Sequence, residues 1–157
     1  MKQIARLLVL AGLVGICVVA WCKRDDRQII AAQRRTPVTV TRLFTGSDGQ
    51  THAEEMDIKL KPHARLDRYE ISQVIQVTKL EFARRSPGFV RDWHASTERT
   101  YGITLSGRAE IEVAGGRKIS LEPGRVVLLE DMKSKGHIAR TVGTEDWVVV
   151  LVQVADQ

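Results

Sequence analysis

Cysteine is almost absent from this sequence, and the two cysteines are confined to one end. Cys17 and Cys22 both lie in an N-terminal apolar segment, and residues 23–157 contain none. A disulfide framework or a cysteine-based zinc site therefore cannot stabilise the larger part of the chain. Aromatic residues are also scarce, at 5% of the chain. Val, Ile and Leu are plentiful, and this mixture favours strands over long helices.

The larger part of the chain also lacks a net charge. The formal charge of +5 comes entirely from residues 1–36, which hold seven basic and two acidic side chains. The remaining 17 basic and 17 acidic residues balance. A neutral domain has no long-range field that attracts phosphate backbones, so we expect no nucleic-acid partner.

Several catalytic motifs are missing as well. The sequence has no Gly-x-Ser-x-Gly elbow, no phosphate-binding glycine loop, no dinucleotide fingerprint and no cysteine after position 22. Acyl transfer by a serine triad and phosphoryl transfer are therefore disfavoured.

The N-terminus carries one apolar run, from Leu7 to Cys22, after Lys2 and Arg6. Its sixteen residues would form a helix of about 24 Å, short of the roughly 30 Å hydrocarbon core of a bilayer. That length suits a secretory signal, with cleavage after Ala20. Lipidation of Cys22 is poorly supported, because Trp21 stands where a small residue is needed.

The charges around this run favour the opposite orientation. Five basic residues follow it closely and two precede it, a bias that resists export and suits an uncleaved anchor with a cytoplasmic body. We therefore predict that residues 1–22 are a signal peptide or membrane anchor. The protein would then be exported to the periplasm or anchored to a membrane, with residues 7–22 as the tether. The alternatives are an anchor with a cytoplasmic body and an upstream extension with little role. Residues 23–36 form a polar linker, and 37–157 form one domain.

The domain alternates apolar and polar residues in short segments separated by Gly and Pro, which predicts about nine or ten strands and no helix. The last segment, Val148 to Val154, is apolar on both faces, so it is covered on both sides by a barrel or by a subunit partner. The fold class is all-β, a sandwich or closed barrel. The expected strands are 38–44, 56–60, 74–82, 89–94, 101–105, 109–113, 119–121, 126–129, 137–142 and 147–154.

Specific motifs point further. Trp93-His94 precedes YGITLSG (101–107), AEIEV (109–113), LEPGRVVLLED (121–131) and Lys135-Gly136-His137. This succession resembles the two-motif pattern of the cupin superfamily, in particular its small single-domain bacterial members, over about residues 38–154. The resemblance implies a single RmlC-like jelly-roll barrel. It says little about activity, because this fold carries many chemistries and many non-enzymes.

The resemblance also implies a metal site. The family pattern of two histidines, a carboxylate and a third histidine falls on His94, Ser96, Thr100 and His137. Two of the four ligands are thus replaced by hydroxyl residues, which are poor ligands for Fe, Mn, Ni or Zn at neutral pH. Glu98 would share the strand face of Thr100 and could complete a site of two histidines and one carboxylate.

Other residues near the motifs are candidates for ligand binding. They are Trp93, Tyr101, Glu130 and Asp131. Trp93 and Tyr101 could equally be wall residues, and Glu130 and Asp131 could be solvated charges at the start of the loop that leads to His137. His52 would be a metal ligand only if the first hairpin folds over the barrel mouth, and surface exposure is the alternative.

Two functions are compatible with these residues. The first is a cupin-domain protein that binds a small organic molecule in the barrel, with a degenerate metal site at His94 and His137. The second is a metal-dependent enzyme, an oxygenase or isomerase of a small organic acid or phenol, with a divalent Fe, Mn, Ni or Zn ion. A purely structural protein with a filled barrel is a third reading. We also predict a homodimer, with Val148–Val154 as the contact strand.

Overall fold

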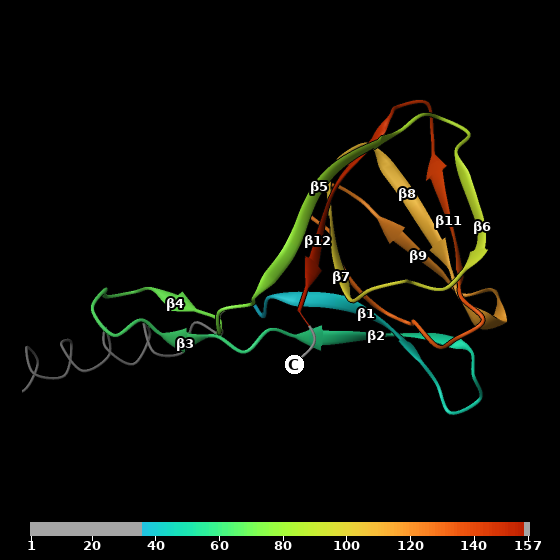
Figure 1. Cartoon of the computed structure of the whole chain (residues 1–157). Helices are drawn as coiled ribbons and strands as arrows, with labels where there is room; N and C mark the ends of the chain where they lie inside the picture. Colours follow the sequence, from blue (N-terminus) through green and yellow to red (C-terminus); the bar gives the residue numbers. More distant parts are fainter. Residues whose placement is uncertain (1–35, 156–157) are drawn as a thin grey trace, which may run out of the picture. The chain divides into compact units, whose positions relative to one another are not determined.

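The computed structural model describes residues 36–155, which fold into two β-sheets that face each other (Figure 1). The predicted signal or anchor and nearly all of the linker lie outside the described residues. Within residues 36–155 no helix is long and apolar enough to cross a membrane. The all-β class predicted from the sequence is confirmed.

The larger sheet has six strands in the order β2-β1-β10-β7-β12-β5. All neighbours pair antiparallel except β1 and β10, which are parallel. The strands are β1 (Thr39–Thr45), β2 (Thr51–Asp57), β5 (Val77–Arg85), β7 (Thr100–Ser106), β10 (Val126–Glu130) and β12 (Trp147–Val154).

The smaller sheet has four antiparallel strands in the order β6-β11-β8-β9. A short 3-10 turn, η1 (Ala114–Gly116), joins β8 to β9. The strands are β6 (Val90–His94), β8 (Arg108–Glu112), β9 (Lys118–Leu121) and β11 (His137–Val142).

The hydrophobic core lies between the sheets because each contributes alternate residues to one cluster. Leu43, Val127 and Val149 come from the larger sheet, and Ile111 and Leu121 come from the smaller one. Two facing sheets whose consecutive strands cross from one sheet to the other form a jelly roll.

Two segments differ from the sequence prediction. The second strand spans 51–57 and not 56–60, because β1 pairs with Thr51–Asp57 across a tight turn. Residues 61–71, read as irregular, contain a small hairpin of β3 (Lys61–Pro62) and β4 (Glu70–Ile71) that lies away from the two sheets (Figure 1). Propensity could not reveal such short strands, whose pairing covers only two residues on each side.

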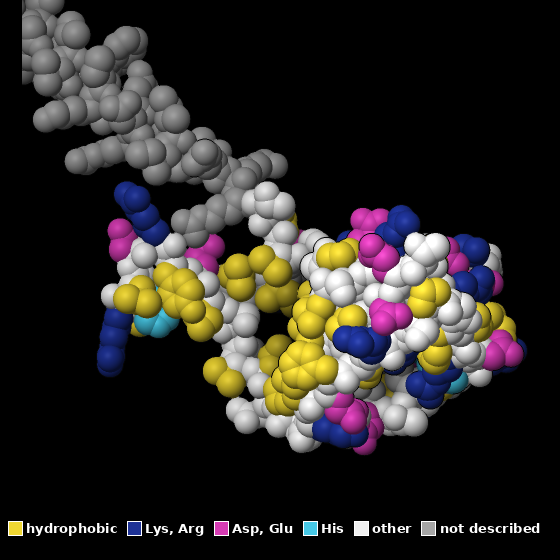
Figure 2. Space-filling view, turned by 90° about the horizontal axis from the view of Figure 1, so that it is seen from above, with side chains coloured by type: hydrophobic (Ala, Val, Ile, Leu, Met, Phe, Trp, Pro, Cys, Tyr) yellow, Lys and Arg dark blue, Asp and Glu magenta, His cyan; other side chains and the backbone are white. Residues whose placement is uncertain are grey.

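The edge strand β5 reverses the usual orientation of polar and apolar residues. Glu81 and Arg85 face the interior, whereas Leu80 and Phe82 are 54% and 72% exposed on the outer face. Figure 2 shows apolar side chains exposed on this side of the molecule. The polar interior of β5 places charged groups next to the core.

Candidate functional site

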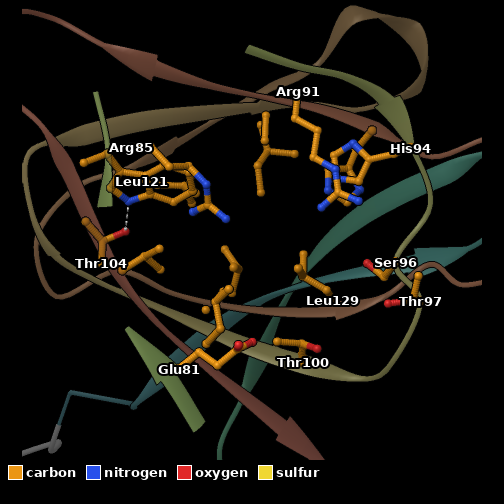
Figure 3. A pocket seen from close by; sticks show the side chains of 18 of the residues that line it. Glu81, Arg85, Arg91, His94, Ser96, Thr97, Thr100, Thr104, Leu121 and Leu129 are labelled. Carbon is orange, nitrogen blue, oxygen red and sulfur yellow. Dashed lines mark hydrogen bonds between the residues drawn. The ribbon is translucent and has the colours of Figure 1, made fainter. Parts of the chain in front are cut away.

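A cavity of about 250 Å³ lies between the two sheets (Figure 3). Its walls combine apolar and polar side chains in about equal measure. The apolar lining includes Ile111, Leu121, Val127, Leu129, Trp147, Val149 and Leu151, and the polar lining includes Glu81, Arg85, Arg91, His94, Ser96, Glu98, Thr100 and His137. A cavity between the sheets in which polar side chains converge beside apolar walls is a candidate small-molecule site.

His94 and His137 lie side by side at one end of this cavity. They sit opposite each other on the paired strands β6 and β11, and their ring centroids are 4.4 Å apart at an interplanar angle of 57°. His137 is buried and His94 is half-buried. Strand pairing thus brings together two imidazoles that are distant in the sequence.

Hydrogen bonds fix the tautomer of each ring. Nδ1 of His94 lies 2.8 Å from the backbone oxygen of Asp92, and a carbonyl can only accept, so this Nδ1 carries a proton. Nδ1 of His137 lies 2.8 Å from Oδ2 of Asp131. Neither Nε2 atom has a hydrogen-bond partner among residues 36–155. In the neutral rings both Nε2 atoms are therefore available to a metal ion or a donor group.

Asp131 is the buried centre of the polar network behind His137. Its carboxylate accepts hydrogen bonds from Thr51 Oγ1 at 2.9 Å, Ser96 Oγ at 2.6 Å and His137 Nδ1. Burial by itself would raise the pKa of Asp131, but the hydrogen bonds from His137 and Ser96 outweigh it and hold that pKa well below its usual range. The carboxylate is therefore ionised, and it accepts a hydrogen bond from the protonated Nδ1 of His137.

His94 is held neutral at pH 7 by its surroundings. Burial lowers its pKa from 6.5, against the hydrogen bond to Asp92, and the nearby charges of His137 and Arg91 lower it further. At neutral pH its Nε2 therefore presents a lone pair to the cavity.

Gly136 allows the start of β11 to lie close to the backbone of His94 at the end of β6. Its φ of +93° lies in the region that favours glycine, and an added Cβ would clash with the backbone carbonyl of His94. Glycine is thus required at position 136 because the backbone contact with His94 that brings the two rings together leaves no room for a side chain.

The four family positions all face the cavity. At the two that lack a metal-binding side chain, Ser96 donates to Asp131 and Thr100 Oγ1 donates to the backbone oxygen of Glu98 at 3.0 Å. Glu98 also lines the cavity, but the described residues contain no group of three or more His, Asp or Glu side chains that could hold a metal ion. Among these residues the structure supplies two imidazoles and no gathered third ligand.

The remaining predicted ligand-binding residues lie elsewhere. Glu130 forms ion pairs with Arg42 and Arg99. Tyr101 points to the opposite face of β7 from Thr100 because neighbouring strand residues alternate, and it lines a smaller cavity of about 140 Å³. Trp93 is half-exposed and does not line the larger cavity. Of the four, the structure brings only Asp131 into contact with the imidazole pair.

His52 also lies outside the larger cavity. It pairs with Asp48, at 3.0 Å between Nε2 and Oδ2, on the first hairpin. Its ring is not gathered with the two cavity imidazoles.

Sequence reasoning missed Arg85, Arg91 and the inward side of Trp147. The signal was present in 79–85, where charged residues at alternate positions share one face. A charged face normally indicates solvent, so the pattern by itself assigns Leu80 and Phe82 to the core, the reverse of what the structure shows.

No known sequence family matches the chain, and a search of curated proteins finds no match. Solved structures with similar folds include a cupin-2 domain protein from Shewanella frigidimarina, at 13% identity and a TM-score of 0.40 over 62% of this chain and 80% of that one. The cupin domain of Cnp3 from Schizosaccharomyces pombe has 12% identity and a TM-score of 0.42 over 80% and 88%. An RmlC-like cupin from Desulfovibrio desulfuricans has 19% identity and a TM-score of 0.37 over 60% and 97%.

The class of the domain follows from its own topology. Two facing sheets in jelly-roll order carry the motif residues on β6, β7 and β11, with their side chains directed into the space between the sheets. The domain is an all-β jelly roll, the fold that the sequence resemblance to cupins implies.

Proposed function

We propose that this cupin domain binds a small organic molecule in the barrel, with His94 and His137 as a degenerate metal site at one end of the cavity. The observation that carries the proposal is the pair of unpartnered Nε2 atoms beside a partly apolar cavity of about 250 Å³. Pockets for drug-sized ligands measure roughly 300–1,000 Å³, so the ligand is smaller than these.

Histidine ring signals in NMR test this function. Acetate, butyrate, benzoate, phenol and benzamide are titrated into the protein, and we expect at least one of them to shift the ring signals of His94 and His137. The His52 signal is the internal control, since that imidazole pairs with Asp48 outside the cavity. His94→Ala and His137→Ala should weaken binding, and His52→Ala should not. A set of probes that leaves both cavity rings unperturbed would contradict the proposal.

A metal-dependent enzyme acting on a small organic acid or phenol is the second candidate. It is favoured by the contact between His137 and Asp131, because metal-ligating histidines usually donate their other ring N–H to a carboxylate or carbonyl. His94 and His137 would hold the ion through Nε2, and Glu98, which lines the cavity but is not gathered with them, would have to move toward the pair to act as the carboxylate ligand. A bound Fe, Mn, Ni or Zn ion would supply Lewis-acid or redox chemistry.

Elemental analysis separates the two candidates. Protein purified without chelators should carry about one metal equivalent if the enzyme proposal holds, and the double variant His94→Ala/His137→Ala should carry none. Metal-free protein whose thermal unfolding is unchanged by EDTA would rule the enzyme out and leave the binding function.

Export or membrane tethering through residues 7–22 also remains a proposal. It is supported by the apolar run and its flanking charges alone. Fractionation of cells expressing the full chain, with N-terminal sequencing of the product, distinguishes a cleaved signal from an anchor.

A further inference from the structure

The end of the cavity away from His94 is occupied by Arg85 from β5 (Figure 3). The guanidinium carbon lies 4.5 Å from the ring centroid of Trp147 and 5.4 Å from that of Phe89. Trp147 is held in place by a hydrogen bond from its Nε1 to Thr104 Oγ1, at 3.2 Å. The two aromatic contacts restrain the guanidinium, and none of its N–H groups has a hydrogen-bond partner among residues 36–155.

Arg85 has no counter-ion among residues 36–155. Its side chain forms no hydrogen bond or ion pair with any of the described residues, and its Nη1 atom is buried without a partner. Its sequence neighbour Arg84 faces the other side of β5 and pairs with Asp146. A charge removed from water without a partner is unfavourable, so an unpaired guanidinium next to a cavity is a site prepared for an anion.

The charged side chains that line the cavity are two cations, Arg85 and Arg91, and two carboxylates, Glu81 and Glu98. Glu81 faces the same space, but its carboxylate pairs with Lys79 at 2.9 Å. Arg91 lines the cavity and has no ion-pair partner among residues 36–155. Burial, and then the charge of Arg91, lower the pKa of Arg85, and a bound anion would relieve both effects.

We propose that the cavity binds a small carboxylic acid as its anion, with the carboxylate on Arg85 and the rest of the molecule extending between the apolar walls toward His94 and His137. The inference rests on the proposed binding function and names its ligand class. A planar carboxylate matches a guanidinium with unpartnered N–H groups through two parallel N–H···O bonds. The apolar lining from Leu121, Val149 and Leu151 suits an uncharged ring or chain on that acid.

Calorimetric titration with matched ligands tests the charge requirement. Acetate, butyrate and benzoate are compared with the neutral isostere benzamide and with phenyl phosphate, using the full chain. Benzoate should bind about tenfold or more tightly than benzamide, since a hydrogen bond to a charged group is the difference between them. Tighter binding of phenyl phosphate than of benzoate would overturn the carboxylate assignment and make the site a phosphate site.

Two arginine variants separate the site from general electrostatics. Arg85→Met removes the cavity cation, and Arg84→Met removes an equal charge one residue away on the outer face. We expect Arg85→Met to lose benzoate affinity by about tenfold or more while Arg84→Met stays within about twofold. The thermal unfolding of Arg85→Met is recorded in the same samples and should show a cooperative transition, which verifies that the variant is folded.

Failure of this inference is distinguishable from failure of the binding function. Equal affinity for benzoate and benzamide, or carboxylate binding that is unchanged in Arg85→Met, would overturn the carboxylate assignment while the cavity still binds a ligand. No perturbation of the His94 and His137 rings by any of the probes, charged or neutral, would overturn both.

Discussion

At the scale of single residues, Asp131 determines the arrangement of the imidazole pair. It is fully buried and accepts hydrogen bonds from three different segments of the chain, contributed by Thr51, Ser96 and His137. A buried carboxylate with this many donors both satisfies its own charge and orients the ring that it contacts. The functional consequence is a His137 ring whose Nε2 is fixed toward the cavity.

Replacing this carboxylate should destabilise the fold. Asp131→Asn keeps the size of the side chain but exchanges one acceptor oxygen for a donor, so at least one buried donor loses its partner. We expect the free energy of unfolding, measured with urea, to fall by about 1–3 kcal/mol. Asp67→Asn, at an exposed side chain in the β3–β4 hairpin, is the control and should change it by less than about 0.5 kcal/mol. Equal effects of the two substitutions would contradict the role given to Asp131.

His94 should make stability depend on pH in the weakly acidic range. Its pKa is lowered in the folded protein, so as pH falls through the unfolded value of about 6.5 the unfolded chain takes up a proton and the folded chain does not. Stability should therefore decline between about pH 7 and the lowered folded pKa. His94→Gln should flatten this part of the profile of the urea midpoint. A slope that persists in His94→Gln would contradict the assignment.

At the scale of elements, the pairing of β6 with β11 depends on the loop that enters β11. Gly136 combines a positive φ with a close approach to the backbone of His94. Gly115 has a similar φ of +75° but open space around it, so it isolates the conformational effect. The two glycines provide a matched comparison between strain alone and strain with a clash.

Gly136→Ala should therefore destabilise the protein more than Gly115→Ala. The second substitution should cost about 1 kcal/mol, from the left-handed backbone alone. The first should exceed it, because the strands must also separate, and it should shift the ring signals of both cavity histidines in NMR. Denaturant unfolding of the two variants measures the difference, and equal losses would show that the contact with His94 is unimportant.

A strand could be located from the sequence where its apolar residues are the buried ones and its polar residues are exposed. Strands such as β11, whose alternate residues are buried in a regular way, were located at the observed bounds of 137–142. In β5 the predicted span of 74–82 was displaced from Val77–Arg85, because the polar side of that strand faces a cavity. The family motifs predicted that His94 and His137 lie close together. The position of Arg85 could not be predicted in this way, because a strand face with charged residues looks the same in sequence whether it lines a cavity or faces solvent.

At the scale of the whole molecule, the structure moves the predicted dimer contact from Val148–Val154 to the neighbouring strand β5. Val148–Val154 was expected to offer a free edge, but β12 is paired on both sides, with β7 and β5. The edge strands of the larger sheet are β2 and β5, and on β5 Leu80 and Phe82 leave apolar area on the outer face. Such area on a sheet that is otherwise well paired favours contact with a second copy of the chain.

Sedimentation equilibrium tests this assembly. The wild-type protein should have the mass of two chains, and Phe82→Lys should shift it to the mass of one. Val90→Lys, at a side chain of comparable exposure on the smaller sheet, is the control and should leave the dimer intact. A wild-type mass equal to one chain would contradict the prediction.

The positions of Arg85 and the imidazole pair have a mechanical consequence. Arg85 belongs to the six-stranded sheet, and the two histidines belong to the four-stranded sheet. A ligand that contacts all three residues therefore connects the two sheets. Occupancy would restrain the separation of the sheets, and amide exchange in β5 and β11 should slow together on binding. Slower amide exchange in only one of the two sheets would mean that the ligand does not contact both.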